Sequence, residues 1–338
     1  MTNPERALRA ACSLAFAAAL GLALTAPAPA TAQAQDQDQT QDQTSEQGCQ
    51  PSAWGAEDQI GSANLVSPDR VKTASQLIKQ GKTQPLGIVI SPDTPAYPPR
   101  GVSLQVVQPN HTGGKPIDLG YEAVANDDLA QLWFGVGSQL DGLGHFGVAG
   151  KFYNCNDWAD FAPITGLTKL GTHNVPPLVG RAVILDMAAH AGVEHLEGGH
   201  AITLEAVEEA MAQQNVEIGE GDIVLFHTGW TEAKLESAPT EWGSVEPGIL
   251  PEVAQMLADR NVMAVGADTW GLDVVPAPEG GKLFYSHVVL LMQHGIYILE
   301  TMNTGPVLAD GVNEFMFVLG QARVQGAVQM IINPVALY

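Results

Sequence analysis

From residue 181 onward the chain alternates short, continuous apolar runs with segments whose apolar residues recur at helical spacing. The apolar runs are 181–187, 222–226, 262–267 and 296–299, and the amphipathic segments include 203–211 and 251–260. A continuous apolar run is typical of a strand that is buried on both faces, and a helix that follows it covers one face. The sequence therefore predicts an α/β fold with a mixed sheet. No linker interrupts residues 49–338, so we expect a single domain there.

The first half of the chain is richer in strands and loops. Ser67 and Pro68 mark the start of a helix that we expect to end at Gly81, because serine is a favoured N-cap and proline a favoured first helical residue. A loop with four prolines, 92–99, either lines a cleft or only connects two strands. Strands are expected at 86–90, 102–107, 315–319 and 328–332, and a further helix, closed by Gly295, at 286–294.

The N-terminal segment has the layout of a secretory signal peptide. Arg6 and Arg9 precede an apolar run, 10–24, and small residues that end at Ala34 provide a cleavage site. A membrane anchor is less favoured, because the run is shorter than the ~20 residues of a spanning helix. Residues 35–48 are polar and of low complexity, which indicates a disordered tether. We therefore expect a signal peptide at 1–34, a tether at 35–48, a folded domain at 49–338 and a periplasmic or secreted protein.

The charge of the chain narrows the choice of partner. Its formal net charge of −22 offers no electrostatic attraction to nucleic acid or to anionic lipid. We expect a small-molecule substrate, with no nucleic acid and no membrane. Cys49 and Cys155 form a disulfide in an oxidising compartment or remain two buried thiols, and the sequence leaves both alternatives open.

The glycine-rich stretch 134–147 contains the residues best suited to chemistry, Gln139, Asp141 and His145. In an extended segment residues 139 and 141 point to the same side, and the intervening glycines let the chain turn His145 back toward them. A carboxylate beside an imidazole suits metal binding or general acid–base catalysis. From spacing alone, a buried Asp–His hydrogen bond with a structural role is the more common arrangement.

The same stretch resembles the signature of the cyclase/kynurenine-formamidase-like family of metal-dependent hydrolases, His-x-Gly-Thr-His-x-Asp-x-x-x-His. Asp141 and His145 match its Asp and its last His, and 137–138 match Gly-Thr. Further blocks similar to the family are 54–65, 221–230, 265–273 and 287–300. The resemblance implies a swivelling β/β/α type of fold, hydrolysis of an amide, cyclic amide or lactone, and a homo-oligomer, dimeric or tetrameric.

Carried over by position, the resemblance implies that Asp141, His287 and Glu300 bind a divalent metal ion. It further implies that His145 is the general acid–base residue, and Glu300 is a second catalytic candidate. Two signature histidines are replaced, by Gly135 and Gln139. Glycine has no side chain to offer, whereas Gln139 has an amide oxygen, so we expect one metal ion with Gln139 as a weaker ligand. Such an oxygen-rich set suits zinc or manganese, with magnesium as a further choice.

Phe134, Phe146 and Tyr153 are expected to bind the substrate, because aromatic rings provide contact area at low entropic cost. His227 is a further candidate, because a residue at the end of a buried strand often faces a ligand, although a structural histidine fits this position equally well. Asp268 and Asp273 flank Trp270, and they either line the cleft or cap its loop. Two other functions remain open. One is a metal-free scaffold that binds a small molecule without turnover, and the other is hydrolysis by an Asp141–His145 pair without metal.

Overall fold

The structure is a computed structural model, and it describes residues 48–107, 117–123 and 125–338. The predicted signal peptide and residues 35–47 of the predicted tether lie outside the described residues. Within the part that the structure describes, no helix is long and apolar enough to cross a membrane.

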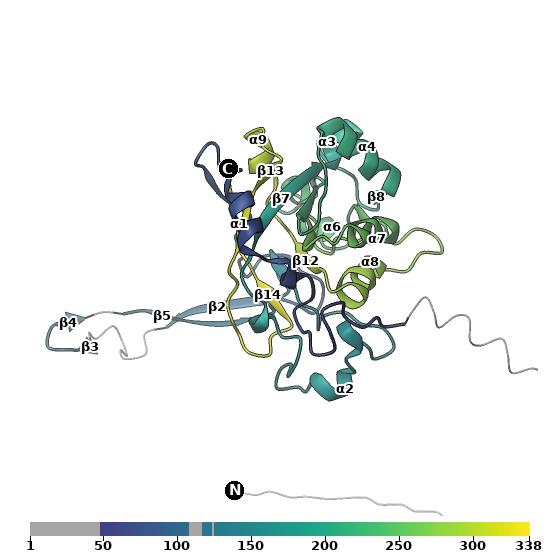
Figure 1. The fold of residues 1–338 in the computed structure, drawn as a ribbon. Helices are drawn as coiled ribbons and strands as arrows, with labels where there is room; N and C mark the ends of the chain where they lie inside the picture. Colours follow the sequence, from purple (N-terminus) through teal and green to yellow (C-terminus); the bar gives the residue numbers. More distant parts are fainter. Residues whose placement is uncertain (1–47, 108–116, 124) are drawn as a thin grey trace, which may run out of the picture. The chain divides into compact units, whose positions relative to one another are not determined.

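Within the described residues the largest sheet has nine strands and is mixed, which confirms the predicted α/β architecture (Figure 1). Four neighbouring strands, β7, β9, β11 and β12, are parallel, and the strands on either side of them are antiparallel. In spatial order the strands are β1 (Thr83–Pro85), β15 (Val335–Leu337), β13 (Glu314–Leu319), β7 (Leu178–Asp186), β9 (Ile223–His227), β11 (Ala264–Ala267), β12 (Tyr297–Glu300), β6 (Gln139–Asp141) and β14 (Gln329–Ile331).

Three two-stranded sheets accompany it. The pair β8 (Ala201–Ile202) and β10 (Gly248–Ile249) is parallel, whereas the other two pairs are antiparallel. Those are β2 (Val102–Val107) with β5 (Asp127–Leu132), and β3 (Ile117–Asp118) with β4 (Glu122–Ala123). The predicted strand at 102–107 is thus present, and most side chains of β2 and β5 are exposed.

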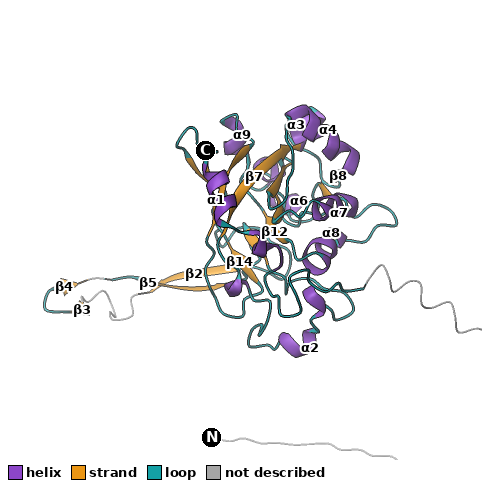
Figure 2. Ribbon diagram, viewed as in Figure 1, coloured by secondary structure: helices purple, strands orange, loops and turns teal. Residues whose placement is uncertain are grey.

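Helices connect the parallel strands, as the alternating pattern predicts. In Figure 2, α3, α4, α7 and α8 lie together beside the sheet, and each contacts the next. The helices are α1 (Pro68–Ser75), α2 (Trp158–Phe161), α3 (Met187–Ala191), α4 (Leu204–Gln214), α5 (Trp230–Lys234), α6 (Pro239–Trp242), α7 (Pro251–Asp259), α8 (Tyr285–His287) and α9 (Gly305–Ala309). Short 3₁₀ turns are η1 (Gly61–Leu65), η2 (Tyr153–Cys155) and η3 (Thr172–Asn174), and η4 (Val288–Gln293) is a π-helix.

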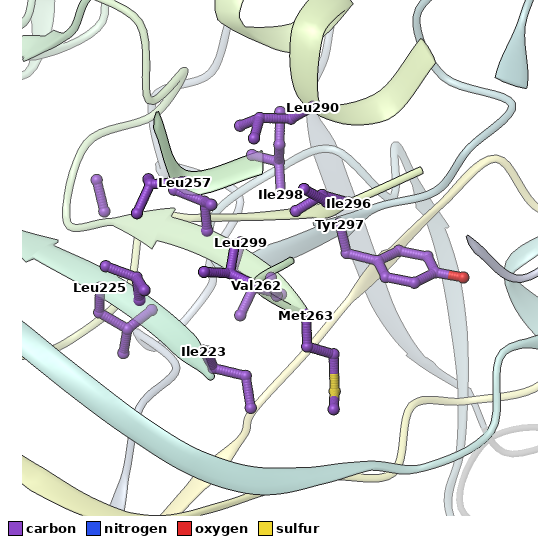
Figure 3. Close-up of a cluster of buried hydrophobic side chains, with 14 of the residues drawn as sticks. Ile223, Leu225, Leu257, Val262, Met263, Leu290, Ile296, Tyr297, Ile298 and Leu299 are labelled. Carbon is purple, nitrogen blue, oxygen red and sulfur yellow. The ribbon is translucent and has the colours of Figure 1, made fainter. Parts of the chain in front are cut away.

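The core lies between the parallel strands and the helices α7 and η4. Figure 3 shows side chains of β9 and β12, among them Leu225 and Ile298, packed near Leu257 of α7 and Leu290 of η4. All four of these side chains are fully buried. Because β9, β11 and β12 are buried on both faces, their sequences are continuous rather than alternating apolar runs.

Two local predictions are wrong. The strand expected at 86–90 is reduced to one isolated bridge between Gly87 and Met302. The Gly87 N–H donates to the Asn333 side chain and the Ile88 N–H donates to Ser138 Oγ, so the pairing does not extend into a strand. The first helix has the predicted Ser67 cap, but it ends at Ser75 rather than at Gly81. Its last amides bond to carbonyls three residues back, which tightens the final turn and ends the helix.

Cys49 and Cys155 are joined by a disulfide, which selects one of the two alternatives that the sequence left open. Asn154 reinforces the link, because its side chain bonds to backbone groups of residues 52, 55, 56 and 58. The Tyr153 hydroxyl also donates to Asp58, at 2.6 Å. Together these contacts attach the start of the described chain beside the segment that follows the glycine-rich stretch.

Candidate active site

The short strand β6 carries Gln139 and Asp141 on one side, as the alternation of a strand requires. Its register with the neighbouring strands places Gln139 opposite Glu300 of β12, and Asp141 opposite Gln329 of β14. Side chains at directly opposed positions touch. Gln139 Nε2 accordingly donates to Glu300 Oε2 at 2.6 Å, and Gln329 Nε2 donates to Asp141 Oδ1 at 2.7 Å.

Gln139 bridges the two carboxylates of the site. Its Nε2 also donates to Asp141 Oδ1, at 3.0 Å, so one amide group binds both Asp141 and Glu300. This bridge uses Oδ1 of Asp141 and Oε2 of Glu300, so Oδ2 of Asp141 and Oε1 of Glu300 make no bond to Gln139. These bonds occupy the Gln139 amide nitrogen and hold the two carboxylates in place. Ligation of a metal ion by the Gln139 amide oxygen, which the sequence led us to expect, stays a prediction.

His287 enters the site from the last residue of α8. Its Nδ1 lies 2.8 Å from Asp273 Oδ2, and the other oxygen of Asp273 accepts the Ser286 N–H. This contact fixes the ring so that Nε2 points to the two carboxylates, 3.7 Å from Asp141 Oδ2 and 3.3 Å from Glu300 Oε1. A histidine that binds a metal ion through one ring nitrogen usually donates the other ring N–H to a carboxylate.

Asp141, His287 and Glu300 converge on one point. Ligand atoms of the three side chains lie within 4.8 Å of one another, and all three residues are buried. Asp141 Oδ2 is buried and has no hydrogen-bond partner. Buried polar atoms are nearly always paired, so an unpaired carboxylate oxygen calls for a missing partner.

The electrostatics of the site also favour an additional cation. Burial and the neighbouring Asp141 carboxylate raise the pKa of Glu300 to about 8. Burial by itself would lower the pKa of His287, but its hydrogen bonds to Asp273 and Glu300 raise that pKa to about 10. Burial and Glu300 likewise raise the pKa of Glu246, which accepts the Trp270 N–H. A raised carboxyl pKa reflects a lack of positive charge, which a bound metal ion would supply.

The donor set fits a divalent metal ion. It consists of one imidazole nitrogen and two carboxylate oxygens, and three protein ligands of these types are typical of catalytic zinc. The unpaired Oδ2 of Asp141 is the observation on which this fit rests. Manganese would suit the same oxygen-rich set.

His145 lies beside this cluster without belonging to it. Its Nε2 is 3.8 Å from Asp141 Oδ2, and its ring borders the cavity described below. Burial lowers the pKa of His145, and the charges of His287 and Arg100 lower it further, against the opposing effect of Asp141. The imidazole is therefore neutral at pH 7 and able to accept a proton.

A cavity of about 320 Å³ opens onto the cluster. Its walls are mainly aromatic, and its polar lining includes two residues of the cluster, His287 and Glu300. The aromatic residues are Tyr97, Phe146, Trp270 and Phe284, and the polar ones are Arg100, His145, His287 and Glu300. The rings of Tyr97 and Trp270 are stacked, with centroids 5.6 Å apart. A planar, apolar ligand would match such walls.

Three of the four expected substrate-binding residues lie elsewhere. Tyr153 is buried and bonded to Asp58, and His227 is buried with its Nδ1 2.8 Å from Thr304 Oγ1. Neither they nor Phe134 line the cavity, whereas Phe146 does. We therefore retain Phe146 alone from that set. The proline-rich loop does line the cleft, through Tyr97 and Arg100.

Sequence reasoning missed several functional positions. Gln329 supports Asp141 from a strand 188 residues away, and Arg100 lies in a loop without a motif. Of the two aspartates that flank Trp270, Asp273 orients His287, and Asp268 accepts from Thr228 and Gly229 as a loop cap. The one available signal was the position of these aspartates at the carboxyl end of a buried parallel strand.

Comparisons with known proteins show the family and the fold. Residues 84–274, more than half of the chain, match the family model described as "Putative cyclase", so the chain belongs to the cyclase family. A solved structure of a "novel cyclase" is 28% identical, covers 84% of this chain and 96% of its own, and superposes with a TM-score of 0.75.

Two more distant structures share the fold. Isatin hydrolase A from Ralstonia solanacearum is 17% identical, with 80% of this chain and 98% of that chain covered and a TM-score of 0.58. A "potential metal-dependent hydrolase with cyclase activity" is 16% identical, with 75% and 98% covered and a TM-score of 0.50. A search of curated proteins gives no significant match.

Proposed function

We propose that this protein is a metal-dependent hydrolase of an aromatic amide, cyclic amide or lactone. The observation that carries the proposal is the unpaired, buried Oδ2 of Asp141, which faces His287 and Glu300 beside an aromatic cavity. Membership of the cyclase family supports it, as does the fold shared with isatin hydrolases, whose name specifies an aromatic cyclic amide.

Asp141, His287 and Glu300 would hold the ion, and Gln139, Gln329 and Asp273 would orient those three. A bound divalent ion would polarise the substrate carbonyl and lower the pKa of a water molecule. His145, neutral at pH 7, would accept a proton from the attacking water at Nε2 and return it to the departing nitrogen or oxygen. Between the two proton transfers His145 is an imidazolium. The Asp141 carboxylate, whose Oδ2 lies 3.8 Å from His145 Nε2, would stabilise that positive charge.

The direct test is hydrolysis by the purified mature protein before and after chelation. The panel contains isatin, an aryl formamide and an aryl lactone, with acid release followed by pH-stat. We expect turnover of at least one compound, its loss after chelation, and its return with Mn²⁺ or Zn²⁺. Turnover that resists chelation would instead favour the metal-independent Asp141–His145 pair. A protein that neither binds metal nor turns over the panel would favour the binding scaffold.

Asp273 provides a test of the supporting groups. Asp273→Asn keeps the shape of the side chain but removes the charge that orients His287 Nδ1. We expect metal affinity to fall about 10- to 100-fold, as is usual when such a carboxylate is lost. A Mn²⁺ or Zn²⁺ titration measures the change, with Asp259→Asn on the exposed side of α7 as the matched control. Unchanged affinity in Asp273→Asn would contradict the assignment of His287 as a ligand.

A further inference from the structure

The guanidinium of Arg100, a residue that lines the cavity, lies against the backbone of Gly135. Arg100 Nη1 donates to the carbonyl oxygen of Gly135 at 2.9 Å. A Cβ at Gly135 would lie 2.6 Å from that Nη1, 2.9 Å from Cζ of the same side chain and 2.8 Å from Oε1 of Gln329. Gly135 does not have a positive φ, so the space and not the backbone conformation requires glycine there. The absence of a side chain at 135 thus allows Arg100 its position.

Arg100 is suited to bind an anion in the cavity. Among the described residues that line it, Arg100 alone has a permanent positive charge. The bond to Gly135 uses one of the five N–H donors of a guanidinium. Within the described part of the chain Arg100 forms no ion pair with a carboxylate. A guanidinium beside aromatic walls matches a carboxylate carried on a ring, because its planar fork pairs with two carboxylate oxygens.

The reaction proposed above creates such a group. Addition of water across the C–N or C–O bond places OH on the carbonyl carbon and H on the departing atom. The acid formed loses a proton at neutral pH. Its carboxylate would then lie in the cavity that Arg100 lines together with His287 and Glu300. Arg100 supplies a fixed positive charge there with which that carboxylate can pair.

We propose that Arg100 binds the carboxylate of the product, so that the cavity recognises aromatic monocarboxylates. The inference rests on the proposed function and names the ligand class of the same site. It makes Arg100 a specificity-determining residue and accounts for glycine at position 135.

The test is calorimetric titration of the mature protein with benzoate and with benzamide, its neutral counterpart. Both titrations are made on the protein as purified and again after chelation. Arg100→Met should weaken benzoate binding about 10- to 100-fold, the usual value of a charge-assisted hydrogen bond, and leave benzamide binding within about twofold. Arg100→Lys should restore part of the benzoate affinity. Arg323→Met, which removes an exposed arginine outside the cavity, is the matched control.

Gly135→Ala tests the position of the guanidinium without removing its charge. The added Cβ displaces the ends of two flexible side chains, Arg100 and Gln329, so we expect a folded protein with weakened benzoate binding. Because Gln329 also bonds to Asp141, the same titration on the chelated protein separates loss of the Arg100 position from an effect on the metal site. Circular dichroism and thermal melting of each variant establish that it is folded.

Three results would overturn the proposal. One is no binding of benzoate to the wild type at 10 mM, on the order of the weakest affinities of interest. Another is equal benzoate binding by Arg100→Met. The third is benzoate binding that disappears on chelation but is the same in Arg100→Met as in the wild type. That result would place the anion on the metal, and it would not contradict the proposed hydrolase function. Conversely, Arg100-dependent benzoate binding in a protein without turnover would support this inference while the proposed function failed.

Discussion

Replacing Asp141 by asparagine should reduce kcat/KM by about a thousandfold or more. The metal ion is expected to contribute several kcal/mol to the reaction, and each ~1.4 kcal/mol corresponds to a factor of ten. Asparagine retains an acceptor for Gln139 and Gln329, but at Oδ2 it places an NH₂ group, which cannot ligate. Steady-state kinetics and metal content of the purified variant measure the effect.

Stability separates this effect from misfolding. In the metal-free protein Asp141 lies close to Glu300, and it contributes to the raised pKa of that residue. Removal of its charge relieves a repulsion, so the metal-free variant should melt no earlier than the metal-free wild type. Asp127→Asn, on the exposed strand β5, is the matched control. An Asp141→Asn enzyme with wild-type kcat/KM would contradict the account.

Replacing His145 by alanine should reduce kcat about 10²- to 10⁴-fold, the usual contribution of a general acid–base residue. Because His145 is outside the ligand cluster, the variant should keep the metal content of the wild type. This combination of lost turnover and retained metal distinguishes a proton-transfer residue from a ligand. A variant that loses its metal along with its activity would assign His145 to the metal site instead.

The pH dependence of the wild-type enzyme gives an independent measure of His145. Burial lowers its pKa from the ordinary value of 6.5. A base acts in its deprotonated form, so kcat/KM should fall as the pH decreases through that lowered pKa. The acidic limb should therefore lie below pH 6.5 in the wild type and be absent from the residual activity of His145→Ala. An acidic limb retained in that variant would belong to another group.

The parallel part of the sheet was predictable because its strands are buried on both faces and therefore read as continuous apolar runs. The runs around Val224, Val265 and Ile298 each became a central strand. The small two-stranded sheets were harder to predict from the sequence, because strands such as Ala201–Ile202 are too short to show a period. The segment after Leu86 read as a strand, yet its amides bond to side chains distant in sequence.

The site was predictable in part for similar reasons. Gln139 and Asp141 point to one side because of the period of a strand, and this could be read locally. That Glu300 lies opposite Gln139 depends on the pairing of β12 with β6, which no local pattern specifies and which only the family resemblance suggested. Arg100 reaches the cavity through the fold of an irregular loop, and nothing in its sequence context marks it.

The most direct test of the central claim is anomalous diffraction from crystals of the protein soaked with Mn²⁺. The account predicts one anomalous peak, within bonding distance of Asp141 Oδ2, His287 Nε2 and Glu300 Oε1, with Gln139 still bridging the two carboxylates. Absence of a peak at this cluster, under conditions in which Mn²⁺ supports turnover, would contradict it.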